Sequence, residues 1–547
     1  MKMNFNHFFN SQTKTVTFAA ILLGMSALAS GALALIRDRL LAGRFGAGQE
    51  LDVYFAAFRI PDFVYGVLIM GGISACFLPV FSEYFRKRKP WELTNNVLNC
   101  FFILLIVLCA ILAIFAPALI RFITPGFSPE DQALTVSLTR IMFLSPIFFG
   151  LSSVFSGVLH YFNRFLVYSI APVLYNLGII FGILFLVPRF SLFGLAYGVI
   201  LGAFLYFLIQ IPAALNSGFK YRFLFNFRHP GLRKIFKLMI PRTIGATCYH
   251  LNLIVITAIA STLIAGSISI FNFSNNLQFF PIGIIGVSFA LASFPALSKS
   301  WAQGEKNKFL NNFSSTFRQI LFLIIPICLL IFLLRAQLVR LILGTGQFGW
   351  FETRLTAASL GLFCLGIWAQ ALIPLLARTF FSFQDTKTPV IIGLASMALN
   401  IFFCFLFVWF LRFPNFFQSF MINLLKLQGI KNIGVVGLPL ALSFSGIFQF
   451  SLLLSFLRKK IGDIKIAEIS KSAEKIIGAT VLTGIAVYLS LKVAALFVNM
   501  QTFLGVLIQT IFAAIVGLLI YLLITYFLKS PEPRIIKSSI LKQFSKR

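Results

Sequence analysis

Residues 243–298 contain no aspartate, glutamate, lysine or arginine. A helix needs about 20 mostly apolar residues to cross a bilayer, so this run is long enough for two crossings. Hydrophobic residues make up 59% of the chain and charged residues only 11%, and a soluble domain could not bury that much apolar surface. The sequence therefore predicts an all-α polytopic membrane protein. Other uncharged runs long enough for a crossing lie at 15–36, 93–120, 165–188, 190–219, 388–411 and 432–457.

The apolar runs predict about 14 transmembrane helices. The loops that include both termini carry 27 of the 46 lysines and arginines, and the alternate loops carry 9. Because positively charged loops stay on the cytoplasmic side, we predict that both termini are cytoplasmic. The predicted spans are 15–36, 52–82, 93–120, 133–160, 165–188, 190–214, 236–263, 267–298, 315–343, 355–380, 388–411, 433–457, 474–498 and 503–528.

An internal repeat divides the chain. GGISACFLPVFSEYF at 71–85 resembles GVSFALASFPALSKSWA at 286–302, and Asn176 in the fifth span matches Asn400 in the eleventh. Spans one to six thus correspond to spans seven to twelve, and six crossings keep both copies in the same orientation. Such a duplicated unit fits alternating access by two rocking lobes. We predict a cytoplasmic N-terminus at 1–14, a first lobe at 15–214, a second lobe at 236–457, two further helices at 474–528 and a basic cytoplasmic tail at 529–547, with an insertion at 413–432.

Charges of both signs gather in the stretch 37–63, which begins with Arg37-Asp38. This stretch holds four of the chain's 15 acidic residues. A charge in the apolar region of a bilayer costs about 2.5–3.5 kcal/mol unless it faces water or a partner. The stretch is therefore a candidate functional site.

The second predicted helix contains several of these charges. Asp52 and Arg59 are seven residues apart and share one helix face, and Asp62 lies three residues beyond Arg59 and can pair with it. Pro61 cannot donate to the carbonyl of Ala57 and is expected to kink the helix. A kinked helix with freed carbonyls is tolerated where it lines a cavity.

The second half of the chain offers a different set of polar groups. Arg242 follows Pro241 inside a predicted span, and Pro281 occupies the repeat position of Pro61. Arginine holds phosphate oxygens with two hydrogen bonds and amides can hold sugar hydroxyls, so a cavity with both suits a ligand with phosphates and hydroxyls. The alternative is that the charged residues pair within the protein and fix helix packing. The amides near Pro281 are Asn272, Asn275, Asn276 and Gln278.

The sequence predicts no catalytic or metal site. It contains no GxxxxGK[ST] phosphate loop, and its 7 cysteines form no CxxC pair while its 4 histidines are scattered. The net charge of +31 resides largely in loops, as expected beside anionic lipid rather than for nucleic acid binding. We expect no cofactor, and a transport step driven by the membrane potential or an ion gradient.

The stretch IRDRLLAGRFGAGQELDVYFAAFRIPDF at 36–63, followed by GGISACFLPVFSEYF, resembles the start of the MurJ/MviN family of lipid II flippases. The shared pattern is an Arg-Asp pair, FGAG, an aspartate, an Ala-Phe-basic-apolar-Pro run and Phe-x-Pro-x-x-x-Glu-Tyr. The resemblance covers the whole chain and implies a member of the multidrug/oligosaccharidyl-lipid/polysaccharide exporter superfamily. Such a protein would be a transporter and not an enzyme, located in the bacterial cytoplasmic membrane.

The resemblance also implies a substrate and a set of binding residues. The substrate would be the undecaprenyl-diphosphate-linked glycopeptide precursor of peptidoglycan, moved to the outer leaflet, with membrane lipids and cell-wall synthesis proteins as further partners. Arg37 and Asp52 match family positions important for function, Asp38 completes the Arg-Asp pair, and Arg59 matches a basic position beside the proline. We therefore predict a substrate site that includes Arg37, Asp38, Asp52, Arg59, Arg242 and Asn276.

The chain departs from the family pattern at several positions. Gly31, Tyr65 and Asn276 stand where family members often have arginine, and Arg242 stands where they often have a small residue. Our hypothesis is that Arg242 replaces some of the lost positive charge. Some members bind a cation through carboxylates of the second lobe, but spans 7, 8, 11 and 12 of this chain contain no acidic residue.

Four other functions remain as alternatives. The missing arginines leave room for a flippase of another undecaprenyl-linked oligosaccharide. A small-molecule antiporter would need a buried carboxylate in the second lobe to carry protons. A membrane-embedded transferase or phosphatase would have only Asp38 and Asp52 as candidate catalytic groups. A scaffold for cell-wall assembly would need no binding cavity.

Overall fold

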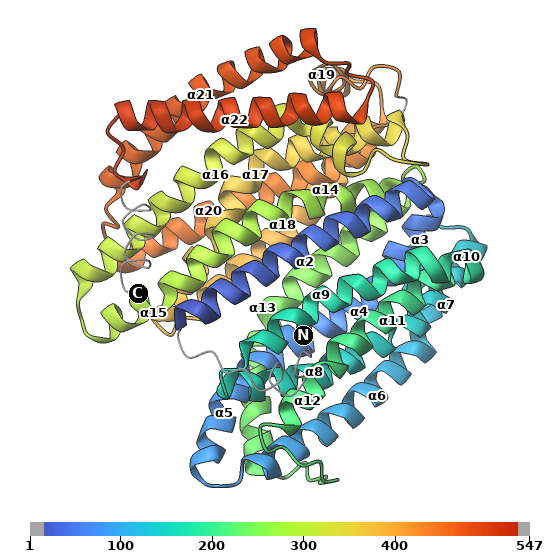
Figure 1. Ribbon diagram of the computed structural model, residues 1–547, viewed down its shortest axis with the longest axis vertical. Helices are drawn as coiled ribbons and strands as arrows, with labels where there is room; N and C mark the ends of the chain where they lie inside the picture. The colour runs from blue at the N-terminus through green and yellow to red at the C-terminus, as the bar shows by residue number, and fades with distance from the viewer. Residues whose placement is uncertain (1–15, 431, 534–547) are drawn as a thin grey trace, which may run out of the picture. The chain divides into compact units, whose positions relative to one another are not determined.

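The computed structural model describes residues 16–430 and 432–533, and within these residues all regular structure is helical (Figure 1). In this part of the chain, 11 helices are long and apolar enough to cross a membrane. The three other predicted spans fall on α2 (Val16–Phe45), on the broken run that starts with α3 (Gln49–Ala57), and on α13 (Pro230–Ser261). The prediction of an all-α polytopic membrane protein is confirmed. The predicted segment 1–14 and most of the predicted tail lie outside the described residues.

The helices group into two compact units, 1–268 and 269–547. The first has a core in which helices of the second, third, fourth and seventh spans meet, with Phe77, Phe81 and Phe101 fully buried. Besides α2, α3 and α13, its elements are α4 (Arg59–Val64), the π-helix η1 (Tyr65–Ile73), α5 (Ser74–Arg86), α6 (Pro90–Ile123), α7 (Pro129–Met142), α8 (Leu144–Tyr161), α9 (Phe165–Phe181), η2 (Gly182–Leu186), α10 (Val187–Phe190), α11 (Phe193–Leu208) and α12 (Gln210–Leu215).

The second unit has its own core, built around Phe309, Phe313 and Phe380, and α21 and α22 lie side by side in it (Figure 1). Asn400 accepts a hydrogen bond from Ser445 Oγ at 3.2 Å inside this unit. Its elements are α14 (Ser267–Pro281), η3 (Ile282–Val287), α15 (Ser288–Ala302), α16 (Lys306–Ile342), α17 (Trp350–Ser382), α18 (Lys387–Arg412), α19 (Phe416–Leu425), η4 (Gly434–Val436), α20 (Gly437–Ile461), α21 (Ile466–Phe497) and α22 (Phe503–Phe527).

The helix of the seventh predicted span, α13, packs within the first unit, although the sequence repeat assigns it to the second lobe. Its N-terminal end is tied to α5 by an ion pair between Lys234 Nζ and Glu83 Oε2 at 2.6 Å. Near its C-terminal end, Gly126 N donates to Ser261 Oγ at 3.3 Å. The boundary between the compact units therefore follows α13, at residue 268, and does not lie in the segment between α12 and α13.

The repeat is visible in the local helix geometry of both halves. In each half, a proline (Pro61 or Pro281) lies close before a π-helical segment, η1 or η3, and the helix that follows contains a second proline. A proline lacks the N–H that closes a helical turn, and π-helical turns often appear where the regular ladder is interrupted. The two halves thus share the same irregularities at corresponding positions.

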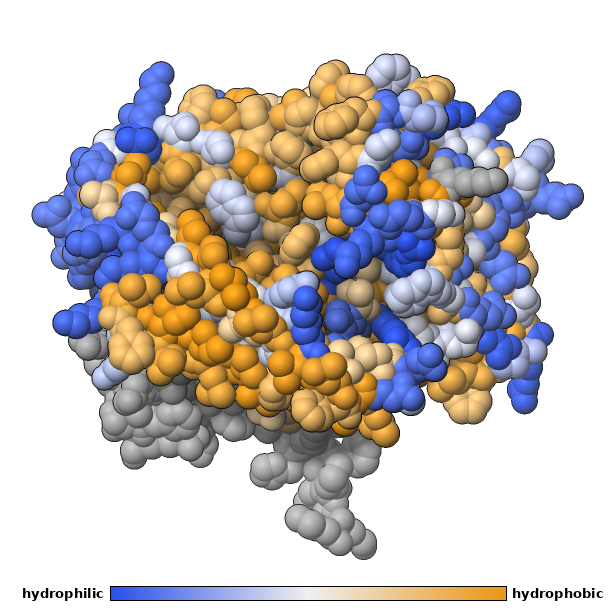
Figure 2. Space-filling view, turned by 90° about the horizontal axis from the view of Figure 1, so that it is seen from above, coloured by the Kyte–Doolittle hydropathy of each residue, from blue (hydrophilic) through white to orange (hydrophobic). Residues whose placement is uncertain are grey.

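Apolar side chains cover much of the surface. Figure 2 shows extensive hydrophobic areas on one face, with hydrophilic side chains gathered in separate groups. On α22, for example, Leu504, Leu519 and Phe527 are exposed. Soluble monomers rarely expose contiguous apolar patches of this extent, so these surfaces are suited to contact with lipid.

The insertion at 413–432 forms the short helix α19. Asn415 caps its first turn by accepting a hydrogen bond from Gln418 N at 2.8 Å. Arg354 of α17 donates to the carbonyls of Lys426 and Gln428 and so fixes the segment that follows the helix.

Candidate functional site

Arg37 of α2 is held by two side chains. Its Nε and Nη2 donate to the same oxygen, Asp38 Oδ1, at 3.0 and 2.8 Å, and its Nη1 donates to Asn176 Oδ1 of α9 at 3.3 Å. Adjacent residues in a helix do not normally face each other, so the guanidinium folds back along the helix to reach Asp38. The side chain of Arg37 is 20% exposed, and that of Asp38 is 4% exposed. Asp38 thus positions a cation that remains accessible.

Asn176 joins α2 to α9 on the other side of Arg37. Its Nδ2 donates to Ser30 Oγ and to Pro172 O, both at 3.1 Å. These bonds fix the orientation of the amide, so that its oxygen points to the guanidinium. The sequence drew attention to Asn176 only through the repeat, and its contact with Arg37 was not predicted.

The second span is broken as Pro61 predicted. The helix stops at Ala57, Phe58 separates it from α4, and η1 follows. The carbonyl of Ala57, which Pro61 cannot bond, lies 3.2 Å from Thr139 Oγ1 of α7, which shares its single O–H between this carbonyl and that of Thr135 at 2.8 Å. A side chain of a neighbouring helix therefore satisfies the freed backbone group, as it must where water is scarce.

Arg59 and Asp62 lie just after this break. Arg59 is 7% exposed, and its Nε donates to Thr257 Oγ1 of α13 at 2.6 Å. Asp62 is close enough to interact electrostatically with both Arg59 and Arg37. The charged stretch therefore forms a connected buried network between α2, α4 and α13. An unpaired charge would be too costly at this depth.

Asp52 points to a different part of the first unit. Its Oδ2 accepts a hydrogen bond from the backbone N–H of Gly266 at 2.8 Å, and it is 2% exposed. Gly266 has a φ of +90°, and a Cβ there would lie 1.9 Å from the carbonyl oxygen of Ala47. This oxygen belongs to the FGAG turn, in which Gly46 also has a positive φ of 64°. Asp52 thus holds the loop that follows α13 against the turn at 45–48.

The two remaining predicted site residues lie elsewhere in the chain. Arg242 is in α13, but its side chain is outside the described part of the structure. Asn276 is in α14 of the second unit, where it is partly exposed. On the same helix, Gln278 Nε2 donates to Asn275 Oδ1 at 3.0 Å, and the other amide atom, Gln278 Oε1, is buried without a hydrogen-bond partner among the described residues.

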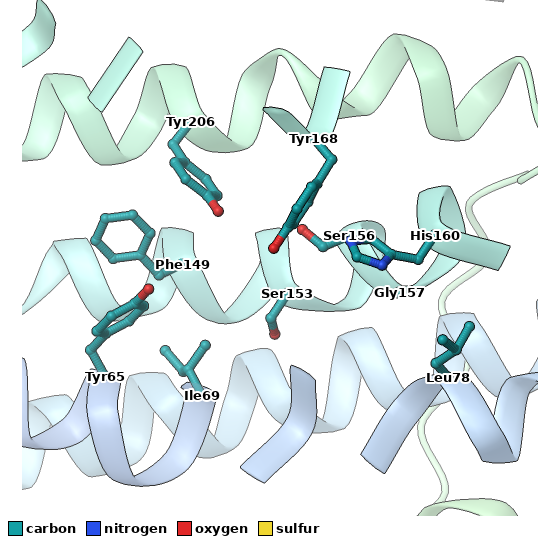
Figure 3. Close-up of a pocket in the computed structure, with 10 residues that line it drawn as sticks. All are labelled: Tyr65, Ile69, Leu78, Phe149, Ser153, Ser156, Gly157, His160, Tyr168 and Tyr206. Atoms are coloured by element: carbon teal, nitrogen blue, oxygen red, sulfur yellow. The ribbon is translucent and has the colours of Figure 1, made fainter. Parts of the chain in front are cut away.

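A polar cavity of about 160 Å³ lies inside the first unit between η1, α5, α8, α9 and α11 (Figure 3). Figure 3 shows the hydroxyl groups of Tyr65, Tyr168 and Tyr206 directed toward this space. Tyr65, at one end of the cavity, interacts electrostatically with Asp62, so the cavity adjoins the charged network. The cavity was not predicted from the sequence. The available signal was the hydroxyl-bearing tyrosines inside apolar spans. Its lining residues are Tyr65, Ile69, Leu78, Phe149, Ser153, Ser156, Gly157, His160, Tyr168 and Tyr206.

The described residues contain no cluster of three or more histidine, cysteine or acidic side chains that could hold a metal ion. All seven cysteines are buried. The chemistry that the site offers is therefore that of arginine, carboxylate, amide and hydroxyl groups. These groups bind ligands by charge and hydrogen bonds.

Known proteins with similar sequences share one description. The family model for lipid II flippase MurJ matches residues 41–509. A probable lipid II flippase MurJ of Buchnera aphidicola subsp. Acyrthosiphon pisum is 30% identical over 387 residues, which cover 70% of this chain and 76% of that protein. Lipid II flippase MurJ of Burkholderia cenocepacia is 29% identical over 385 residues, which cover 68% of this chain and 74% of that protein.

Solved structures show the same fold. A lipid II flippase MurJ in an inward closed conformation superposes with a TM-score of 0.73 at 24% identity, and the match covers 93% of this chain and 99% of that one. An inward-facing multidrug resistance MATE family transporter of the MOP superfamily gives a TM-score of 0.63 at 14% identity, over 80% of this chain and 95% of that one. These two likenesses concern the fold.

Proposed function

Since this chain belongs to the MurJ family of lipid II flippases, we propose that it moves lipid II from the inner to the outer leaflet of the bacterial cytoplasmic membrane by alternating access, with Arg37 as a contact for the lipid-linked precursor. A flippase of this kind is a transporter and not an enzyme. The proposed role of Arg37 rests on its hydrogen bonds, which use only some of its N–H donors in the described structure.

Arg37 has donors to spare. A guanidinium group carries five N–H groups, and in the described structure Arg37 uses three of them, two toward Asp38 and one toward Asn176. The remaining two N–H groups belong to Nη1 and Nη2, and the side chain is 20% exposed. Arginine binds phosphate oxygens through such paired donors. Asp38 and Asn176 fix the plane of the guanidinium before a diphosphate arrives, which reduces the ordering cost of binding.

Residues of the second half are proposed to hold the rest of the substrate. Asn276 is partly exposed on α14, and an amide can donate to and accept from sugar hydroxyls or peptide groups. The hypothesis that Arg242 compensates for missing arginines is kept as part of this proposal. It predicts that Arg242→Ala abolishes transport at a normal expression level, and full activity of that variant would contradict it.

Orientation and driving force belong to the proposal as well. The chain is a multi-pass protein of the bacterial inner membrane. The distribution of lysine and arginine supports cytoplasmic termini. Moving one elementary charge through 100 mV provides about 2.3 kcal/mol, so the membrane potential or an ion gradient is a sufficient source of energy.

A flippase for another undecaprenyl-linked oligosaccharide is the second candidate. The observation that favours it is the loss of arginine at three positions, Gly31, Tyr65 and Asn276. Tyr65 lines the polar cavity of the first unit, which gives that position a different chemistry. The candidate predicts that glycans without a peptide support transport.

The deciding experiment is rescue of a bacterial strain depleted of its own lipid II flippase. Wild type and Arg44→Ala are expected to restore growth, because Arg44 is exposed at the end of α2 and far along the helix from Arg37. Arg37→Ala is expected to fail at an equal membrane level, and Arg37→Lys to rescue weakly, since lysine cannot make the paired contacts. Rescue by Arg37→Ala would remove Arg37 from the substrate site. Failure of the wild type at normal membrane insertion would favour the second candidate.

A further inference from the structure

The segment 220–228, between α12 and α13, combines exposed aromatic and basic side chains. The backbone from Lys220 to Asn226 forms neither helix nor strand. The aromatic residues alternate along it and are 58%, 71%, 45% and 48% exposed at Tyr221, Phe223, Phe225 and Phe227. Between and beside them lie the exposed basic side chains of Lys220, Arg222 and Arg228. Aromatic and basic side chains are therefore exposed together on one short segment.

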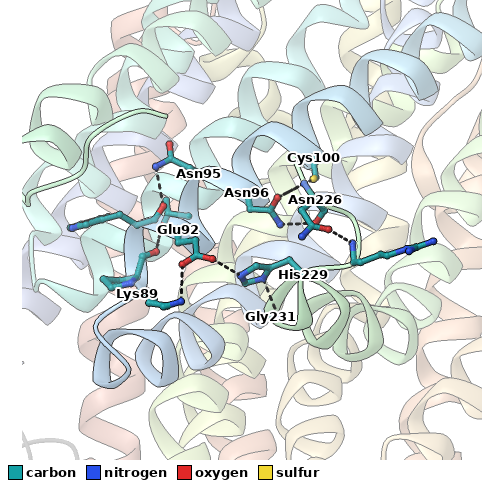
Figure 4. A network of polar contacts seen from close by, with 12 residues as sticks. Lys89, Glu92, Asn95, Asn96, Cys100, Asn226, His229 and Gly231 are labelled. Atoms are coloured by element: carbon teal, nitrogen blue, oxygen red, sulfur yellow. Dashed lines mark hydrogen bonds and ion pairs between the residues drawn. The ribbon is translucent and has the colours of Figure 1, made fainter. Parts of the chain in front are cut away.

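Three asparagines of α6 bind the backbone of this segment. Asn95 donates to Lys220 O and accepts from Arg222 N, both at 2.9 Å. One residue along, Asn96 donates to Asn226 O at 3.0 Å and accepts from Asn226 N at 2.7 Å, a pairing drawn in Figure 4.

Asn99 binds the middle of the segment. It donates to Arg222 O at 3.2 Å and to Leu224 O at 3.1 Å, and its own oxygen accepts from Tyr221 Oη at 3.0 Å. Asn95, Asn96 and Asn99 are 1%, 2% and 3% exposed.

The hydrogen bonds from these asparagines explain how a non-helical segment can lie beside a membrane helix. The asparagines occupy the first turns of α6, one of the helices able to span the membrane. Non-helical backbone is tolerated next to hydrocarbon only where its N–H and C=O groups are satisfied by the protein. In water the carbonyls of this segment would need no such partners, whereas three buried amides supply them here.

We propose that residues 220–228 form an interfacial anchor that binds anionic phospholipids of the cytoplasmic leaflet. The aromatic rings lie at the boundary between headgroups and acyl chains, where aromatic side chains are favoured. Lys220, Arg222 and Arg228 contact the lipid phosphates, and a basic residue near an anionic surface increases binding by about fivefold. The proposal rests on the orientation given under the proposed function, which places this loop in the cytoplasm.

The test measures the depth of a probe on this segment in lipid vesicles. Phe223→Cys is labelled with a small fluorophore and the protein is reconstituted with phosphatidylcholine and phosphatidylglycerol. All seven native cysteines are buried, so the wild type is the blank. The matched control is Asn307→Cys, an exposed position in another part of the chain that is predicted to be cytoplasmic. Lipids brominated on the acyl chain are expected to quench the label at 223 at least about twofold more than the label at 307.

The charge is tested in the same vesicles. Brominated phosphatidylglycerol is expected to quench the label at 223 at about a tenfold lower mole fraction than brominated phosphatidylcholine. The triple variant K220Q/R222Q/R228Q, changed only at exposed positions, is expected to lose this preference and to keep the quenching by phosphatidylcholine. If both lipids quench the label equally while Lys220, Arg222 and Arg228 are still present, the preference for anionic lipid is disproved.

Two further outcomes would overturn the anchor itself. One is a label at 223 that responds to an aqueous quencher as the label at 307 does. The other is a label shielded from water yet unquenched by either lipid, which would indicate a protein contact. Quenching needs no lipid II, so the result is independent of the transport assay. Reaction of the Phe223→Cys variant with an impermeant thiol reagent in intact cells would separately disprove the orientation.

Discussion

Replacing Asp52 with alanine is expected to loosen the loop after α13. The carboxylate accepts a hydrogen bond of 2.8 Å from the buried N–H of Gly266. A hydrogen bond to a charged group contributes about 1.5–3 kcal/mol, and its loss leaves the N–H without a partner. At 1.4 kcal/mol per factor of ten, the loop should open about 10- to 150-fold more often.

Hydrogen exchange measured by mass spectrometry reads this opening directly. The peptide that covers 262–268 should exchange about 10- to 150-fold faster in Asp52→Ala, while Asp52→Asn should lie between this variant and wild type because the amide keeps an acceptor. Glu50→Ala is the matched control, since Glu50 is an exposed acid on the same helix. Unchanged exchange at 262–268 together with lost rescue would refute the clamp and return Asp52 to the substrate site.

Three other predictions concern groups that stabilise the packing inside one compact unit or the other. The valine variant of Thr139 keeps the shape but lacks the hydroxyl that bonds the carbonyl freed by Pro61, and it should lower the free energy of unfolding by about 1 kcal/mol, which serine at this position restores. Hydrogen bonds from Lys234 and Lys87 lower the pKa of Glu83, just beyond the second span, to about 2. Because the pKa is depressed in the folded state, this contribution to stability is present above pH about 4.5 and is lost as the pH falls toward 2, and Glu83→Gln should remove it from a pH titration of thermal stability. Glu532 is fully buried, and its ion pair with an arginine of α16 spans 3.6 Å. Its alanine variant should lower the free energy of unfolding in a denaturation assay by about 1–3 kcal/mol, since it removes this ion pair and the hydrogen bond from Ser472 Oγ at 2.7 Å, while Arg318 keeps Glu468 at 3.9 Å.

The sequence was informative where the physics is local. Apolar runs of sufficient length predicted the spans, because a helix in lipid must satisfy its own backbone. Pro61 predicted the break of the second helix. Each of these features depends on a few neighbouring residues. Such features can be inferred without knowing how the helices pack.

The partners of the buried charges could not be inferred in this way. Arg59 bonds a threonine 198 residues away, and Asp52 bonds a backbone N–H 214 residues away. A sequence repeat also cannot say to which compact unit a helix attaches, so α13 was assigned by its repeat and the contacts group it with the first six spans. The polar cavity depends on three tyrosines from three elements that only packing brings together.

The charges gathered between residues 37 and 63 divide into two roles. Asp52 and Arg59 make hydrogen bonds to α13 and the loop after it, which favours the packing alternative for these two residues. Arg37 differs, because Asp38 and Asn176 occupy three of its donors and, among the described residues, leave two, on a side chain that is still partly exposed. A cation that served only to fix packing would be expected to use its donors within the protein, as buried charges generally do. The unused donors of Arg37 therefore make it the residue of this stretch best suited to meet a phosphate.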